Sequence, residues 1–328
     1  MPDGKEYIPP RCNSYLLGHE AEEKKLLDAF KDNSLHNSWI ISGVKGIGKA
    51  TFAYKFARVL LNDDGRLVSQ NSHPDLKIIE RDYTDTDKRK IMKAIKDGQP
   101  LDESDLSGLK KSSFIRVDDV RTINEFLSKR SSNDGWRVVV IDSVDEMNSA
   151  SANAVLKILE EPPYKTVMLL VSHNPNKLLP TIKSRCAKLQ LKPLNDDIVA
   201  SLLRRYRPDV KEAEVKEIAK ISGGSIGKAI DYVDCGALKS YQELCKIIYA
   251  KDKFLLKDLM NFADVNEYEL AKELILKFIS ENVRSCSSVE DMADVWDKAL
   301  SVFSETEGLN LDKKQALINV INSICKVI

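Results

Sequence analysis

The chain has 328 residues, 43% of them hydrophobic, which is enough for two or three domains with substantial cores. Lysine plus arginine and aspartate plus glutamate each total 50, so the net charge is zero and no overall field attracts nucleic acid or an anionic membrane. The six cysteines form no CxxC pair, which argues against a zinc site, and no stretch resembles a signal peptide or a membrane span. We therefore expect a cytoplasmic protein with reduced thiols.

The first predicted helix runs from Glu20 to Phe30, where apolar residues recur at helical spacing. The sequence ISGVKGIGKAT, Ile41 to Thr51, then predicts a strand, a glycine-rich turn and a second helix. This order is typical of loops that hold phosphate groups at the amino end of a helix.

The spacing of Gly43, Gly48 and Lys49, with Gly46 between them, matches the phosphate-binding P-loop. Glycines let backbone N–H groups turn toward phosphate oxygens, and Lys49 would neutralise the outer phosphates together with the helix dipole. The pattern next requires a Ser or Thr hydroxyl for magnesium, but this chain has Ala50.

Thr51 does not replace that hydroxyl, because one step along a helix turns a side chain by about 100°. It could still contact an inner phosphate. The loop is therefore predicted to hold a phosphate and to be poorly equipped to cleave one. The alternative is that the glycines only allow tight packing of strand against helix.

The next region is predicted to contain a polar connector, a short strand over Leu76 to Ile79 and, from Val117 to Leu127, a helix. Between these elements, dense mixed charge with Gly and Pro predicts an irregular insertion over Arg81 to Ser113. Its basic residues, Lys88 to Lys96, form either a DNA-contacting surface or a solvated face.

Arg137 to Ile141 predicts a buried strand that delivers Asp142 at its carboxyl end. In P-loop proteins such a carboxylate assists magnesium and a following glutamate activates water, but here Ser143 follows. Asp145 and Glu146 are expected to cap or begin the next helix. The alternative for Asp142 is a simple turn residue at the strand end.

Ser149 to Glu161 is predicted to be a helix that two prolines end. Further strands are predicted over Thr166 to Val171 and after the turn Ser184 to Cys186. Strands that alternate with helices predict an α/β fold with a mostly parallel sheet covered on both faces.

The sequence after Pro193 shows helical periodicity only. Three short helices are predicted up to Val233, with a break at Gly223 and Gly224, and a separate helical bundle follows from Leu238. We therefore predict three domains, over residues 1–192, 193–236 and 237–328.

Two long segments, VVVIDSVDEMNSASANAVLKILEEPP and LLVSHNPNKLLPTIKSRC, resemble the clamp-loader ATPases of the AAA+ superfamily. The likeness includes LLGHE, NSHPDL, IRVDDVR and GGSIGKAI, and so covers roughly the first 235 residues. The LEEPP and SRC motifs together are specific, whereas the P-loop alone is not. The resemblance implies that the three ranges are an AAA+ P-loop domain, a helical lid and a helical collar.

The family further implies a subunit of the bacterial DNA polymerase III clamp loader, a hetero-pentamer that places a sliding clamp on primed DNA. In this family the arginine of the SRC motif reaches into the neighbouring subunit's ATP site as a trans-acting arginine finger. That residue is Arg185 here. The alternative is an arginine that only pairs locally at a turn.

Three positions depart from the ATP-hydrolysing members. Ala50 and Ser143 replace a hydroxyl residue and a glutamate, and Gly227 followed by Lys228 stands where those members have an arginine. The resemblance therefore implies a subunit that binds ATP or ADP without hydrolysis, or leaves its loop empty. The four-cysteine zinc module of such subunits is missing between Leu60 and His73, so we expect no zinc.

Two rival interpretations remain. In one, the chain is a working ATPase motor in which Thr51 and either Asp145 or Glu146 replace the missing groups. In the other, it is a P-loop kinase or another small-molecule enzyme, which leaves the LEEPP and SRC stretches unexplained.

Overall fold

The computed structural model divides the chain into two compact units, Met1–Ile198 and Val199–Ile328. The first contains a β-sheet between helices, and the second consists of helices, beginning within α9 (Asp196–Tyr206). The predicted boundaries at residues 192 and 236 stay predictions. The described residues are 8–96, 109, 111–132, 134–249, 260–263, 267–283 and 289–328.

The strands of the first unit are β1 (Ser38–Ser42), β2 (Leu76–Ile79), β3 (Arg137–Ile141), β4 (Thr166–Ser172) and β5 (Ala187–Gln190). They form one sheet in the order β2-β3-β4-β1-β5, and all neighbours are parallel. Every residue of the three central strands is buried, which explains why their sequences are nearly unbroken apolar runs. The predicted parallel α/β sheet is confirmed.

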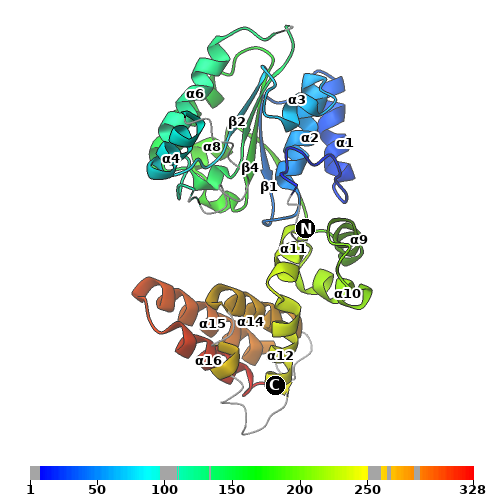
Figure 1. Ribbon diagram of the computed structural model, residues 1–328, viewed down its shortest axis with the longest axis vertical. Helices are drawn as coiled ribbons and strands as arrows, with labels where there is room; N and C mark the ends of the chain where they lie inside the picture. The colour runs from blue at the N-terminus through cyan, green and yellow to red at the C-terminus, as the bar shows by residue number, and fades with distance from the viewer. Residues whose placement is uncertain are drawn as a thin grey trace. The chain divides into compact units, whose positions relative to one another are not determined.

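The helices of the first unit are α1 (Glu20–Lys31), α2 (Lys49–Leu61), α3 (Arg66–Ser69), α4 (Asp85–Lys96), α6 (Val117–Ser128), α7 (Ser149–Glu160) and α8 (Pro180–Lys183). Figure 1 shows α1, α2 and α3 on one side of the sheet and α4, α6 and α8 on the other. Successive strand residues point to opposite faces, so the sheet separates two cores. Ile41 packs in the core with α2, and its neighbour Ile40 packs in the core with α6 and α7.

Helix α4 corrects the expectation of an irregular segment over Arg81 to Ser113. Its acidic residues, Asp85 and Asp87, lie in the first turn and two of its lysines, Lys93 and Lys96, lie in the last turn, so these charges complement the helix dipole. The side chain of Thr84 also accepts a hydrogen bond from the N–H of Asp87 at 3.4 Å. The composition is polar, but its order along the chain favours a helix. Residues 97–108 and 110 of the segment lie outside the described residues.

The start of α7 also differs from expectation. Asn148 caps this helix by accepting a hydrogen bond from the N–H of Ser151 at 2.9 Å. Asp145 and Glu146 instead lie in a short 3-10 turn, Val144–Glu146, so neither caps α7.

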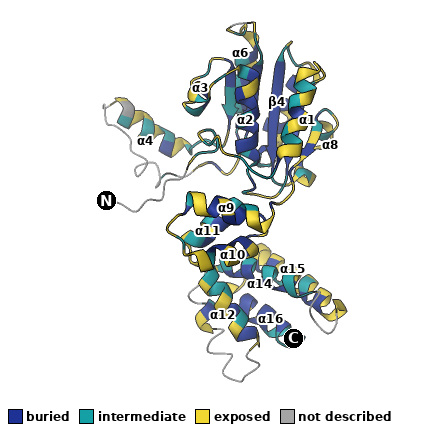
Figure 2. Cartoon of the chain, turned by 90° about the vertical axis from the view of Figure 1, so that its right-hand side faces the viewer, coloured by how far each residue is buried: buried dark blue, intermediate teal, exposed yellow. Residues whose placement is uncertain are grey.

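The second unit continues with α10 (Glu212–Ile221), α11 (Ile226–Asp234), α12 (Ala237–Tyr249), α14 (Tyr268–Asn282), α15 (Val289–Leu309) and α16 (Lys313–Ile324). The three predicted short helices are confirmed, and Gly223 and Gly224 separate two of them with positive φ values of 62° and 80°. Figure 2 shows helices of this unit with buried residues along one side and exposed residues along the other. In the part of the chain that the structure describes, no helix is long and apolar enough to cross a membrane.

Candidate phosphate-binding loop and Arg185 pocket

The glycine-rich loop joins the carboxyl end of β1 to the amino end of α2. Gly43, Gly46 and Gly48 have positive φ values of 149°, 81° and 97°, which residues with a side chain rarely adopt. At Gly43 the space is restricted as well, because an added Cβ would lie 2.6 Å from both the carbonyl oxygen of Leu191 and Cδ1 of Ile47. The backbone of this loop therefore depends on glycine at Gly43.

Replacing Gly43 with alanine should destabilise the first unit by about 1–3 kcal/mol through backbone strain, with the contact to Leu191 adding to the loss. Chemical denaturation of both variants measures the difference. Gly135→Ala is the matched control, because no atom lies within 4 Å of a Cβ added there. Equal stability of the two variants would contradict the assigned loop conformation.

Lys49 begins α2 and is only 3% exposed. Its Nζ donates a hydrogen bond to the carbonyl oxygen of Val44, within the loop, at 2.6 Å. Burial lowers the pKa of Lys49 to about 8, and the nearby carboxylate of Asp142 opposes part of that shift. A buried ammonium group at the amino end of a helix is suited to an anionic ligand.

The affinity of the loop for a nucleoside triphosphate should therefore fall as the pH rises through about 8. Below this pH Lys49 is already charged in the free protein, whereas above it binding must take up a proton, because the bound anion stabilises the ammonium form. The expected loss approaches about tenfold per pH unit. Magnesium-free binding titrations with labelled ATP measure it, and Lys49→Arg should remove the dependence because its guanidinium stays charged. A flat profile for the unaltered protein would contradict the role of Lys49.

Asp142 directly follows β3, at the same edge of the sheet as the glycine-rich loop. Burial raises the pKa of Asp142 to about 6, with the carboxylates of Glu80 and Glu146 adding to the effect and Lys49 opposing it. Asp142 is thus mostly ionised at neutral pH, near the buried ammonium group. The position agrees with the prediction of a carboxylate at the strand end.

The two acidic residues of the rival motor interpretation have other partners. Asp145 accepts hydrogen bonds from the hydroxyl of Ser172 at 2.6 Å and from the N–H of Asn174 at 3.1 Å. Glu146 forms an ion pair of 2.7 Å with Arg81. These contacts weigh against either carboxylate activating a water molecule.

The side chains of the loop fit a phosphate better than they fit its magnesium ion. Gly43 to Lys49 provides the glycines and the ammonium group, but Ala50 offers no oxygen ligand and Thr51 is buried, with 8% exposure. Lys228 of α11 forms an ion pair with Glu273 of α14.

Sequence reasoning missed two histidines at this edge. His19 is buried, and its Nε2 lies 2.9 Å from the carbonyl oxygen of Ile47, within hydrogen-bond distance of the loop. His173 follows β4, and a hydrogen bond of 2.9 Å joins its Nε2 to the hydroxyl of Ser143. Burial and the charge of Lys49 lower the pKa of His173 to about 4, so it is neutral at pH 7. For His173, the available signal was that carboxyl ends of parallel strands meet at one edge of the sheet.

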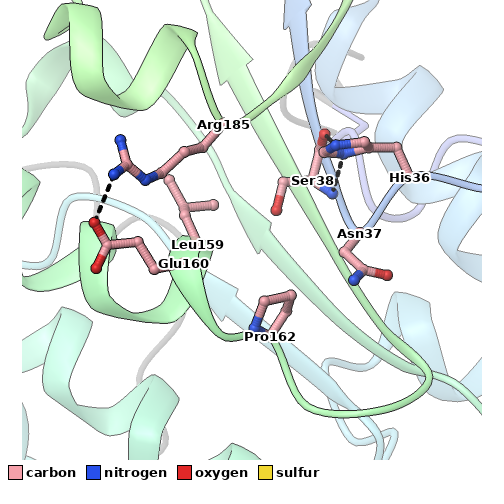
Figure 3. A pocket seen from close by; sticks show the side chains of 7 residues that line it. All are labelled: His36, Asn37, Ser38, Leu159, Glu160, Pro162 and Arg185. Atoms are coloured by element: carbon pink, nitrogen blue, oxygen red, sulfur yellow. Dashed lines mark hydrogen bonds and ion pairs between the residues drawn. The ribbon is translucent and has the colours of Figure 1, made fainter.

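Arg185 lies in a separate pocket (Figure 3), before β5. Its guanidinium forms an ion pair of 2.8 Å with Glu160 at the end of α7 and donates a hydrogen bond of 3.1 Å to the carbonyl oxygen of Thr181. The side chain of Arg185 is 36% exposed. The pocket is lined by His36, Asn37, Ser38, Leu159, Glu160, Pro162 and Arg185.

The register of the sheet places this pocket and the loop at opposite ends of the parallel strands. Trp39 of β1 pairs with Ala187 of β5, so Arg185 is level with the residues that precede β1. Gly43 follows the other end of β1, six residues beyond Asn37. At about 3.3 Å per residue, the two sites are about 20 Å apart along the strands. Arg185 is therefore too far away to act on a phosphate held by its own loop.

Comparison with known proteins identifies the family. A sequence model described as "DNA polymerase III, delta subunit" matches residues 18–195, more than half of the chain. This protein belongs to that family. The match includes the glycine-rich loop, Asp142 and Arg185, and the clamp-loader likeness seen in the LEEPP and SRC motifs is confirmed.

Three curated relatives are similar over different parts of the chain. The subunit tau/gamma of Haemophilus influenzae is 27% identical over 303 residues, 90% of this chain and 40% of that protein. The delta' subunit of Pseudomonas aeruginosa is 46% identical over 113 residues, 34% of each protein. The delta' subunit of Escherichia coli is 26% identical over 237 residues, 69% of this chain and 63% of that protein. The chain thus spans less than two thirds of the length of these relatives.

One solved structure agrees in fold. A DNA polymerase III gamma subunit-related protein of Thermotoga maritima superposes with a TM-score of 0.51 at 19% identity, over 93% of this chain and 99% of that one. At this identity the likeness concerns the fold alone, a parallel α/β domain followed by helices.

Proposed function

We propose that this protein is the delta-prime type of subunit in a DNA polymerase III clamp loader, and that it supplies Arg185 to the ATP site of a neighbouring subunit. Family membership supports the clamp-loader assignment. The delta' relatives support the delta-prime type, although the tau/gamma relative matches a larger share of the chain.

The position of Arg185 is the observation that supports this function best. The guanidinium lies at the amino end of the parallel strands, whereas the chain's own glycine-rich loop lies at their carboxyl end. The pocket around the guanidinium is open to solvent. An arginine placed there can contact a phosphate only when a second subunit brings one to it. Its charge would then stabilise the negative charge that develops on the transferring phosphoryl group.

The chain's own loop is proposed to hold ATP or ADP without hydrolysing it. Gly43, Gly46, Gly48 and Lys49 would surround the phosphates, with Thr51 near an inner one and Asp142 at the strand end. Ala50 and Ser143 remove two groups that hydrolysis uses, and His173 is already hydrogen-bonded to Ser143. The bound nucleotide would then stabilise the structure of the subunit and would supply no energy from hydrolysis.

The proposed partners are the other subunits of a hetero-pentamer, the sliding clamp and primed DNA. The helices of the second unit from Leu238 onward would form the collar through which the subunits associate. The basic residues of α4 remain a candidate for contact with DNA.

The test is ATP turnover by the reconstituted loader with Arg185→Ala in place of this chain. Turnover should fall sharply, and unchanged turnover would exclude the finger. The rival motor function has one supporting observation, the tau/gamma likeness over 90% of the chain. Phosphate release by the isolated chain that disappears on replacing Lys49 would favour the motor.

A further inference from the structure

Arg185 is held by a carboxylate of its own chain. Figure 3 shows the guanidinium of Arg185 and the carboxylate of Glu160 facing each other on one side of the pocket, and their ion pair is 2.8 Å long. The neighbouring residues Leu159 and Cys186 are buried, with 5% and 7% exposure, so the backbone on both sides of the pair is anchored in the core. The backbone of both residues is thus fixed, while their charged groups are partly exposed to solvent.

Glu160 lies at an unfavourable place for an acidic residue. It is the last residue of α7, where the helix dipole presents its negative end, and the acidic Glu161 follows directly. Among the described residues, Arg185 is the cation that forms an ion pair with Glu160. The helix end does not stabilise this carboxylate, and Arg185 does.

The ion pair between Arg185 and Glu160 is also easily broken in favour of another anion. The side chains of Arg185 and Glu160 are 36% and 49% exposed, so solvent screens the attraction, and an ion pair of this kind is weak. A phosphate from a neighbouring subunit can therefore replace Glu160 at the guanidinium if its own charge is high enough. A triphosphate has more negative charge than a diphosphate and competes better.

We propose that Glu160 is a positioning residue that restrains Arg185 and makes its transfer to the neighbouring site depend on the charge of the nucleotide there. With a diphosphate in the neighbouring site, Arg185 stays on Glu160. With a triphosphate, it leaves Glu160 and contacts the phosphates. This inference rests on the proposed function, because it needs Arg185 to act in trans.

The experiment compares Glu160→Gln with Glu161→Gln in the reconstituted loader. Both variants remove one negative charge from the same helix end, and Glu161 is exposed. In Glu160→Gln the ATP concentration for half-maximal turnover should fall about two- to fivefold, the range expected for a screened pair, and ADP should inhibit more strongly. The maximal rate should change less than the half-saturating concentration. Glu161→Gln should match the unaltered loader.

Two further measurements separate a restraint on Arg185 from a structural effect. In the Arg185→Ala background, Glu160→Gln should have no effect on half-saturation, because the two residues act through one contact. In the isolated chain, nitrogen-15 spectra should show a shift of the Arg185 side-chain N–H signal in Glu160→Gln and not in Glu161→Gln.

The inference fails if Glu160→Gln behaves as Glu161→Gln does, or if its main effect is a lower maximal rate. Its failure differs from that of the proposed function. An Arg185→Ala loader with full turnover excludes the finger itself. Impaired turnover in Arg185→Ala, with no effect of Glu160→Gln on half-saturation, excludes only the restraint.

Discussion

Replacing Arg185 with alanine should lower ATP turnover at the neighbouring site by about 10³- to 10⁵-fold, the effect that an arginine finger has on phosphoryl transfer. The physical reason is that, among the described residues that line the pocket, Arg185 is the one with a permanent positive charge. Single-turnover hydrolysis by the reconstituted loader measures the loss directly, because it does not depend on release of the clamp or of product.

The same variant should remain folded. Arg185 is partly exposed, and its pair with Glu160 is screened by solvent, so the unfolding free energy should change by no more than about 1 kcal/mol. Arg185→Lys is the useful companion, because it keeps the charge and loses the paired N–H donors, and it should restore only part of the rate. A loader that turns over normally with Arg185→Ala would rule out the trans role.

Replacing Lys49 with alanine should weaken nucleotide binding to the isolated chain by about 2–5 kcal/mol, or roughly 30- to 5,000-fold, because a buried charged partner of the phosphates is lost. Equilibrium binding of labelled ATP, with and without magnesium, measures this loss. Phosphate release by the same sample should be undetectable before and after the change.

Lys45→Ala is the control, because it removes a positive charge from an exposed position of the same loop. The unfolding free energy of Lys49→Ala shows whether Lys49 serves in ligand binding or in packing. Burial disfavours the charged form of Lys49, so Lys49→Ala should cause no marked loss of stability at pH 7. Unchanged ATP affinity in Lys49→Ala would mean that the loop does not bind through its lysine.

Much of the fold could be predicted because each central strand is a short apolar run between turn signals. The runs ending at Ile41 and Ile141 indicated strands, and Gly43 to Lys49 indicated the turn between β1 and α2. The sites followed from the same reasoning, since Asp142 and the glycine-rich loop each come directly after a strand of one parallel sheet.

The remaining features depend on order within the chain or on contacts between distant residues. Helix α4 was missed because its composition is polar, although the sequence of its charges suits a helix. The contact of His173 with Ser143 joins residues 30 positions apart. The pair of Glu160 with Arg185 depends on where α7 ends relative to β5. No local pattern specifies contacts of this kind.

The parallel direction of the strands also determines how copies of such a subunit can be joined. A parallel sheet has two different ends, and here one has the glycine-rich loop and the other has Arg185. A contact that brings the arginine end of one molecule to the loop end of the next is heterologous, so it leads to a ring or a filament and not to a twofold dimer. In a mixed ring, one member can have an active arginine end and an inactive loop end. The contact at its loop end then differs from the other contacts and distinguishes one position in the ring.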